Sequence, residues 1–247
     1  MSQKIALVTG GIGGIGTSIC KQLSKDGFKV VANYIAPEAE KAKQWQEDQK
    51  KSGFDFAIAE GDVSNHADCE AMIQKLTSEV GPVDVLVNNA GITRDGMFKK
   101  MPLENWMNVL NINLNSVFNV TRQVINGMLE KGWGRVINIS SINGQKGQFG
   151  QTNYSAAKAG MHGFTKALAQ ETAAKGITVN TISPGYIGTD MVMAIDEEIR
   201  NQIISGIPVG RLGKPEEIAK LVGYLASEDA GFITGSNIAI NGGQHMF

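Results

Sequence analysis

Residues 4–25, KIALVTGGIGGIGTSICKQLSK, decide the fold of this chain. The opening KIALVT is an apolar run bounded by glycine, typical of a central parallel strand that is covered on both faces. The spacing of residues 17–25 predicts an amphipathic helix. The glycines between them permit a tight turn and let backbone N–H groups approach a pyrophosphate at the helix N-terminus. The predicted contacts of this turn are Gly10, Gly13, Gly14, Ile15 and Gly16.

Strand-like runs alternate with helical patterns along the rest of the chain. Further strands are predicted at residues 30–34, 54–59, 83–87, 135–139, 178–182 and 237–240, and helices at 37–52, 65–79, 103–128 and 151–175, with another starting at Pro215. This alternation implies one doubly wound parallel sheet of seven strands with helices on both faces, an α/β fold of the Rossmann type. No linker, charge block or repeat marks a boundary, so residues 1–247 are expected to form a single domain.

Composition narrows the class of protein. Of 247 residues, 42% are hydrophobic, which is ample for a core. A net charge of −1 gives no sign of the basic face that nucleic-acid and membrane-surface proteins carry. No apolar run reaches the roughly 18 residues of a membrane span, and the N-terminus enters a strand without a signal-like region, so a cytoplasmic protein is expected.

The cysteines and histidines show no metal-binding pattern. Cys20 and Cys69 lie on different predicted helices and are interpreted as reduced packing residues. His66, His162 and His245 are scattered without zinc-like spacing, so no metal is expected.

Tyr154 and Lys158 are the leading candidates for catalysis. They are four residues apart, so on a helix both side chains leave the same face about one turn apart. A nearby ammonium favours phenolate, so the pKa of Tyr154 is expected to be lowered, which makes the phenol a proton donor near neutral pH. Ser141 follows the predicted strand 135–139 and would reach the same crevice. Taken alone, a Tyr–Lys pair at this spacing is more often an exposed surface pair.

Short motifs along the whole chain surround this pair. They are Thr9-Gly10, Gly14-x-Gly16, Asp62-Val63, Asn88-Asn89-Ala90-Gly91, Asn113, Ser141, Tyr154, Lys158, and Pro184-Gly185 with Thr189. Through them the chain resembles the classical short-chain dehydrogenase/reductase family over nearly its whole length. The resemblance implies a carbonyl reductase: Tyr154 protonates the carbonyl oxygen, Ser141 stabilises the oxyanion, and Lys158 holds the nicotinamide ribose. A non-catalytic NADP-binding sensor or scaffold remains the alternative of another class, because a fold alone does not exclude it.

The resemblance also implies cofactor contacts. Asp62, with Gly61 and Val63 beside it, would bond the adenine amino group, and Asn89, Ala90 and Gly91 would line the cofactor. The turn at Pro184 and Gly185 would place Ile187 and Thr189 against the nicotinamide carboxamide. Tyr154 and Lys158 complete the set. Judged by its position alone, Asp62 could instead cap the helix 65–79.

The end of the second predicted strand favours NADPH over NADH. An acidic side chain there would bind a ribose 2′-hydroxyl, but residues 33–36, NYIA, carry no carboxylate. Tyr34 is expected to border the cofactor. The family's usual Arg or Lys is also missing, so Lys41 or Lys43 is the candidate contact for the 2′-phosphate. Either lysine is as readily a solvated charge.

Asn113 is expected to complete the catalytic set. In the family, the Asn of the N-x-N-L segment distorts its helix and holds a water that relays protons between the lysine and solvent. Sequence spacing does not select Asn113, since Asn111, Asn115 and Asn119 are equally polar. The choice rests on the resemblance, chiefly on the neighbouring Leu114.

Residues 143–151, NGQKGQFGQ, are similar to the loop of the acetoacetyl-CoA reductases of polyhydroxybutyrate synthesis. Amides and an aromatic ring suit a short 3-oxoacyl thioester. With Ser141 and Tyr154, the expected substrate contacts are Asp95, Gln148, Phe149, Gln151 and Tyr186. The alternative for Asp95 and Tyr186 is that each only hydrogen-bonds the loops. The implied reaction is the NADPH-dependent reduction of acetoacetyl-CoA to (R)-3-hydroxybutyryl-CoA.

The alternative substrate is a 3-oxoacyl-[acyl-carrier-protein] of fatty-acid synthesis. The catalytic groups would be identical, but an acidic carrier protein needs a positive docking surface, and residues 130–135 offer little charge for one. The cations nearer the expected pocket, which could meet the phosphates of a CoA, are Arg94, Lys99, Lys100 and Lys146.

Two further expectations concern a segment that could close over the substrate and the assembly of subunits. Residues 188–210 are predicted to be a substrate lid, because 190–206 have helical apolar spacing, although an ordinary surface helix fits equally well. The family resemblance implies a homotetramer, assembled through the helices near residues 105–131 and 155–175 with help from the C-terminal strand.

Overall fold

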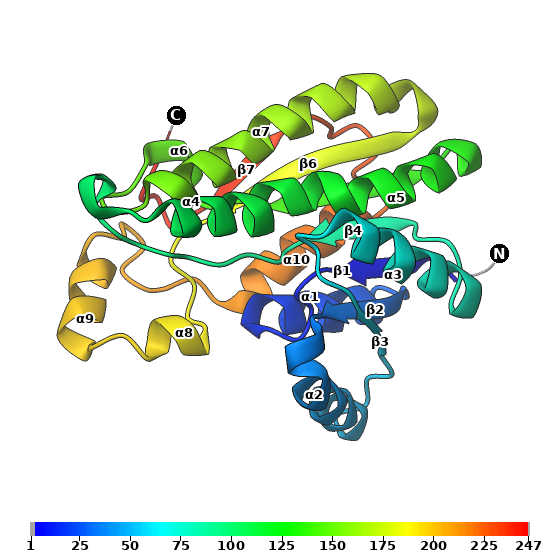
Figure 1. The fold of residues 1–247 in the computed structure, drawn as a ribbon, viewed down its shortest axis with the longest axis horizontal. Coiled ribbons are helices and arrows are strands. Elements are labelled where there is room, and N and C mark those ends of the chain that lie inside the picture. Colours follow the sequence, from blue (N-terminus) through cyan, green and yellow to red (C-terminus); the bar gives the residue numbers. More distant parts are fainter. Residues whose placement is uncertain (1–2, 247) are drawn as a thin grey trace.

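The computed structural model describes residues 3–246, and a sheet of seven parallel strands forms its centre (Figure 1). The strands are β1 (Ile5–Val8), β2 (Lys29–Tyr34), β3 (Ala57–Glu60), β4 (Val85–Asn88), β5 (Gly134–Ile139), β6 (Ile177–Pro184) and β7 (Asn237–Ile240). The α-helices are α1 (Gly14–Lys25), α2 (Ala39–Lys51), α3 (His66–Glu79), α4 (Leu103–Leu110), α5 (Ser116–Lys131), α6 (Asn143–Lys146), α7 (Thr152–Thr172), α8 (Asp190–Met193), α9 (Glu197–Ser205) and α10 (Pro215–Ala226). The prediction of a doubly wound parallel sheet of the Rossmann type is confirmed.

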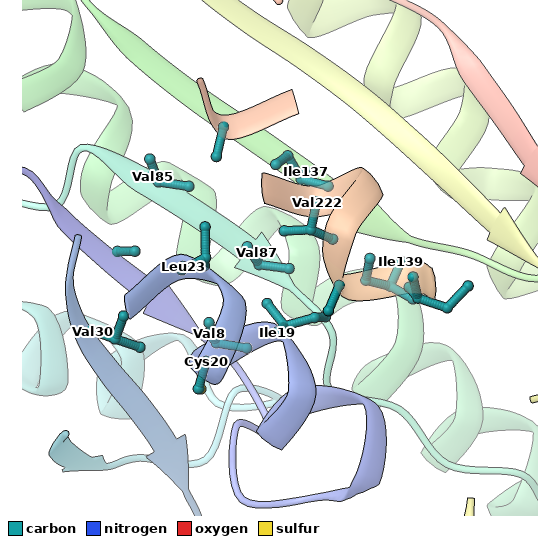
Figure 2. Close-up of a cluster of buried hydrophobic side chains, with 14 of the residues drawn as sticks. Val8, Ile19, Cys20, Leu23, Val30, Val85, Val87, Ile137, Ile139 and Val222 are labelled. Atoms are coloured by element: carbon teal, nitrogen blue, oxygen red, sulfur yellow. The ribbon is translucent and has the colours of Figure 1, made fainter. Parts of the chain in front are cut away.

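Successive strand residues face two apolar cores, one on each side of the sheet. In β1, Ala6 and Val8 pack toward α1 and α10, whereas Ile5 and Leu7 belong to the core beneath α3 and α5. Figure 2 shows the first core, in which Leu23 of α1 lies among strand valines. Because both faces are covered, the strands read as continuous apolar runs rather than as alternating ones.

The strand order creates a crevice beside β1. The order across the sheet is β3-β2-β1-β4-β5-β6-β7, so the chain moves outward from β1 to β3 and then returns to pair β4 with β1 on the other side. The connections after β1 and β4 therefore diverge and leave space at the carboxyl ends of the strands. Asn89, just after β4, donates from Nδ2 to the carbonyl of Thr9 at 3.0 Å, which fastens the two strand ends together.

The long predicted helix over residues 103–128 is divided. A π-helical turn, Asn111–Asn115, separates α4 from α5. Ser116 Oγ donates to the carbonyl of Ile112 at 2.6 Å. A π-turn inserts an extra residue and re-aims the side chains within it, and such turns are common at functional sites.

The helical pattern of residues 190–206 is also interrupted. It forms α8 and α9, because Asp196 begins a new helix by accepting a 2.9 Å hydrogen bond from the backbone N–H of Glu198. An aspartate at this position satisfies N–H groups that have no partner within the helix. The segment is therefore two short helices joined by a turn.

Cys20 in α1 and Cys69 in α3 are both buried and free, as expected for packing residues. Among residues 3–246, no helix is long and apolar enough to cross a membrane.

Candidate active site

Tyr154 and Lys158 lie in the first two turns of α7. Lys158 is only 3% exposed, and its Nζ donates a 2.7 Å hydrogen bond to the carbonyl of Ile139 at the end of β5. The same Nζ lies 5.6 Å from the centroid of the Tyr154 ring. The pair is therefore an internal feature at the edge of the sheet, and the alternative of an exposed surface pair is wrong.

Ser141 reaches the pair from the end of β5. Its Oγ accepts a 3.1 Å hydrogen bond from the backbone N–H of Asn143, and Ser141 and Tyr154 line the same cavity. The short helix α6 packs closely on α7: a Cβ at Gly144 would lie 2.8 Å from the carbonyl carbon of Lys158. A side chain at this glycine would push the serine and the Tyr–Lys helix apart.

The titration of these groups differs from the sequence prediction. Burial raises the pKa of Tyr154, the Ser141 hydrogen bond opposes that shift, and the Asp95 carboxylate adds to it. Burial also lowers the pKa of Lys158 to about 7. The expected depression of the Tyr154 pKa is therefore wrong for the protein without cofactor. Desolvation disfavours the charged form of both groups, so near neutral pH only part of the Lys158 population carries the charge that was to act on the phenol.

A cavity of about 570 Å³ joins this catalytic group to the glycine turn. The predicted residues on its wall are Gly10, Gly13, Gly14, Ile15, Gly16, Lys41, Asn89, Ala90, Gly91, Ser141, Gln151, Tyr154, Lys158, Pro184, Gly185, Tyr186, Ile187 and Thr189. Residues that are far apart in the sequence therefore meet in one crevice, at the edge of the sheet where α/β proteins bind ligands.

The glycine end of this cavity fits a pyrophosphate. Helix α1 begins at Gly14 and has no acidic residue in its first turn, so its N–H groups present a positive potential. A Cβ at Gly14 would lie 3.2 Å from the Thr189 side chain and narrow the space between the turn and the strand β6 loop. A Cβ at Gly16 would come within 2.3 Å of the Gly10 carbonyl, so the turn itself requires glycine.

Three predicted adenine-side residues lie elsewhere. Tyr34, Gly61 and Asp62 line a separate hollow of about 700 Å³ beside α3. Val63 is buried, and its carbonyl accepts a 3.0 Å hydrogen bond from Asn119 Nδ2.

Asp62 does not cap α3. Its Oδ1 accepts from the backbone N–H of Ser64 at 2.9 Å, whereas Asn65 provides the cap by accepting from Ala67 at 3.0 Å. The capping alternative for Asp62 is therefore wrong.

Asn113 is distinguished from its neighbours by its surroundings. It is fully buried in the π-turn, and its amide makes two hydrogen bonds to the backbone of Ile92, of 2.7 and 2.8 Å. A Cβ at Gly91 would lie 3.1 Å from Asn113 Oδ1 and 3.4 Å from Lys158 Nζ, so all three residues are close neighbours. Asn115 bonds Asn111 at the surface, so neither of them shares this position.

The predicted substrate residues divide into two groups. Gln151 and Tyr186 line the cavity, whereas Asp95 is absent from the wall and its Oδ2 accepts a 2.8 Å hydrogen bond from Gln151 Nε2. Gln148 and Phe149 are absent from the wall: Gln148 accepts from Lys146 Nζ at 3.0 Å, and Phe149 is 85% exposed. Gly147 and Gly150, which flank these two residues, both have positive φ, a backbone conformation that favours glycine.

The catalytic geometry agrees with the comparisons to known proteins. The family profile described as short chain dehydrogenase matches residues 4–200. The chain belongs to the short-chain dehydrogenase family. It is 60% identical over 243 residues to a protein of Allochromatium vinosum named acetoacetyl-CoA reductase, covering 98% of this chain and 99% of that one. It is 59% identical over 246 residues to the acetoacetyl-CoA reductase of Cupriavidus necator, covering 100% of both. It is 44% identical over 243 residues to the 3-oxoacyl-[acyl-carrier-protein] reductase FabG of Vibrio cholerae, covering 98% of both.

Sequence reasoning missed Glu38, a carboxylate on the cavity wall of this short-chain dehydrogenase. It ends the 3₁₀ turn η1 (Ala36–Glu38), two residues beyond residues 33–36, where a carboxylate would have indicated NADH. Its Oε1 accepts a 2.8 Å bond from Lys41 Nζ, and both side chains line the cavity. Lys43 bonds Glu40 instead and lies outside the wall. Only one of the two candidate lysines therefore faces the cavity.

Asn153, the second missed residue, is fully buried in the first turn of α7. Its Nδ2 donates to the carbonyls of Arg94 at 3.0 Å and Asn105 at 3.3 Å, while Oδ1 accepts from the backbone N–H of Tyr154 at 2.8 Å. One amide thus connects Tyr154 to the segment that carries Asp95. The only sequence signal was a polar residue next to Tyr154.

Proposed function

We propose that this short-chain dehydrogenase reduces acetoacetyl-CoA to (R)-3-hydroxybutyryl-CoA with NADPH, as a step of polyhydroxybutyrate synthesis. The observation that carries the proposal is the meeting of Ser141, Tyr154 and Lys158 on the wall of a cavity that continues to the glycine turn. The choice of substrate is supported by the 59–60% identity to two acetoacetyl-CoA reductases, against 44% to the carrier-protein reductase.

Each catalytic side chain has one task in this proposal. The bound nicotinamide would supply the hydride to the ketone carbon. Tyr154 donates its phenolic proton to the carbonyl oxygen, and Ser141 donates a hydrogen bond to the same oxygen as its charge develops. Because the pKa of Lys158 is about 7, this lysine can both give and take a proton near neutral pH. We therefore assign it the replenishment of the Tyr154 proton, with the adjacent Asn113 on the path to solvent.

The cofactor would be held by groups along the whole cavity. The glycine turn at α1 would take the pyrophosphate, Asn89, Ala90 and Gly91 the middle of the molecule, and Lys158 the nicotinamide ribose. Pro184, Gly185, Ile187 and Thr189 would surround the nicotinamide. Tyr34, Gly61, Asp62 and Val63 stay as proposed neighbours of the adenosine. Lys41, which faces the cavity, is our proposed contact for the 2′-phosphate.

The substrate would enter between two loops that are joined at the mouth of the cavity. Gly96 N–H donates to the carbonyl of Gly150 at 2.8 Å, next to the Asp95–Gln151 bond. We propose that Gln151, Tyr186 and Asp95 hold the acetoacetyl group. Gln148 and Phe149, which lie outside the cavity wall, would meet the thioester arm.

A CoA substrate is favoured by the cations around this mouth. Across residues 3–246 the observed ion pairs include none of Arg94, Lys99, Lys100 and Lys146, so these charges are available for phosphates.

The decisive experiment compares kcat/KM for acetoacetyl-CoA and for acetoacetyl carrier protein. We expect the CoA thioester to be the better substrate, with activity falling as the acyl chain lengthens. A strong preference for acetoacetyl carrier protein would instead assign the enzyme to fatty-acid synthesis. If neither substrate were turned over, the protein would be a non-catalytic dinucleotide-binding sensor.

The remaining proposals concern assembly, closure and location. We propose a single functional domain in which residues 188–210, with α8 and α9, close over the substrate.

We also propose a homotetramer, since Leu103, Met107 and Phe118 along α4 and α5 are 75%, 44% and 53% exposed. The two free cysteines suit the reducing cytoplasm, where we place the reaction.

A further inference from the structure

Glu38 and Lys41 form an ion pair at the edge of the cofactor cavity. The distance between Glu38 Oε1 and Lys41 Nζ is 2.8 Å, and the side chains are 37% and 62% exposed. Strand β2 brings them there: Gly11 N–H donates to the carbonyl of Asn33 at 3.1 Å, so the end of this strand lies directly beside the glycine turn. The 3₁₀ turn that follows β2 ends at Glu38, and α2 then begins.

The other charged residues on the cavity wall belong to other segments of the chain. They are Lys158, which is buried beside Tyr154, and Asp190, which follows Thr189 at the start of α8. Glu38 and Lys41 are thus the charged side chains of the wall that belong to the segment after β2, where α/β sheets meet the adenosine ribose.

The two charges of the pair act in opposite directions on a 2′-phosphate. Lys41 would attract it, but in this structure the ammonium is already bonded to a carboxylate. A phosphate that binds Lys41 must compete with Glu38 and then lie close to its negative charge. A ribose 2′-hydroxyl carries no charge and meets no such repulsion.

We propose that Glu38 is a specificity-determining residue that lowers the preference of this enzyme for NADPH over NADH. It competes with the 2′-phosphate for Lys41 and repels that phosphate. The inference rests on the proposed function in taking Lys41 as the phosphate contact. Glu38 would therefore lower the preference for NADPH, whereas Lys41, its ion-pair partner, would raise it.

The chain offers a matched control for this inference. Lys43 and Glu40, both on α2, form a second pair with the same three-residue spacing, the same 2.8 Å distance and a lysine that is also 62% exposed. Neither of them lines the cavity. Glu38→Gln and Glu40→Gln therefore remove the same charge and break the same kind of pair, but only the first changes the cavity wall.

The experiment measures kcat/KM for NADPH and NADH, and the Kd of each cofactor by fluorescence, for both variants. Glu38→Gln should raise the NADPH-to-NADH ratio roughly two- to fivefold, the scale of one exposed ion pair, while Glu40→Gln leaves the ratio unchanged. The gain should shrink at about 0.5 M salt, because exposed charges are screened over a few ångströms there. A change caused by local refolding would persist at high salt.

Several outcomes separate this inference from the proposed function. An equal rise in both variants, or no rise in Glu38→Gln, would overturn the role of Glu38. If wild-type enzyme favoured NADH but Glu38→Gln still raised the ratio, the role of Glu38 would stand and the proposed cofactor would fall. If Lys41→Gln left the ratio unchanged while Glu38→Gln raised it, direct repulsion by Glu38 would stand, and Lys41 would be removed from the phosphate site.

Discussion

Lys158 donates a 2.7 Å hydrogen bond from Nζ to the carbonyl oxygen of Ile139, the last residue of β5. This bond directs the lysine inward beside Tyr154 instead of outward into solvent. Burial then lowers the pKa of the ammonium to about 7. Lys158 is therefore poised to exchange protons at neutral pH, and its charge in the folded protein depends on pH in a range where most lysines are permanently charged.

The titration of Lys158 predicts how stability changes with pH. Its pKa is lowered on folding from 10.5 to about 7, so between these values the unfolded chain binds more protons and stability rises with pH. Lys158→Met lacks this dependence. The unfolding free energy of the variant minus that of wild type should fall by up to about 1.4 kcal/mol per pH unit above pH 7 and level off below it. Urea denaturation from pH 6 to 10 measures the difference, and a constant difference would mean that Lys158 titrates normally.

Tyr154→Phe should bind NADPH but lose turnover. The phenyl ring fills the same space, whereas the proton donor is gone, so we expect kcat for acetoacetyl-CoA to fall by at least about 100-fold. Fluorescence titration with NADPH should give a Kd near that of wild type. A substantial residual rate at intact cofactor binding would assign protonation to another group.

The two candidate lysines should differ in their effect on the cofactor. We expect wild-type enzyme to have the higher kcat/KM with NADPH. Lys41→Ala should lower the NADPH-to-NADH ratio several-fold, because Lys41 lines the cavity, while Lys43→Ala, whose side chain lies outside it, should not. Steady-state kinetics of the three proteins with both cofactors test this. Better use of NADH by wild type would contradict the cofactor assignment.

Asn153→Ala should affect both stability and substrate binding. It leaves the carbonyls of Arg94 and Asn105 without their amide donor, and we expect a loss of roughly 2–3 kcal/mol in unfolding free energy. The segment that carries Asp95 also loosens, so KM for acetoacetyl-CoA should rise while the Kd for NADPH is retained.

Asn126→Ala, at an exposed position of α5, is the control and should stay within about 0.5 kcal/mol of wild type. If Asn153→Ala lost stability with an unchanged KM at a temperature where it is folded, the residue would be structural only.

Phe118→Glu should dissociate the proposed tetramer. Phe118 is 53% exposed on α5, with the His66 ring stacked 5.9 Å away, and a carboxylate there would be costly in an apolar contact. Light scattering should report a smaller species. Phe149→Glu, which changes an even more exposed phenylalanine on another surface, should keep the wild-type mass. An unchanged mass for Phe118→Glu would place the subunit contacts elsewhere.

The sequence by itself determined the features that depend on local chemistry. The glycine turn between β1 and α1 follows from backbone sterics, the apolar strand runs from burial on both faces, and the placement of Tyr154 and Lys158 one turn apart from helical geometry. The type and approximate position of each strand were predictable for the same reason. Asn113 was chosen through the family resemblance, because Asn111 and Asn115 beside it are the same residue type and spacing alone could not separate them.

Only the tertiary structure decided the properties that depend on distant neighbours. Burial against β5 reversed the expected titration of Tyr154 and Lys158, because desolvation depends on all the surrounding segments and not on one helical turn. The path of residues 147–150 left Phe149 85% exposed and off the cavity wall. The pairing of β2 with β1 brought Glu38 to the cavity wall, where it faces the same space as residues after β4, β5 and β6. Such meetings arise from the order of strands in the sheet, and no local pattern in the sequence encodes that order.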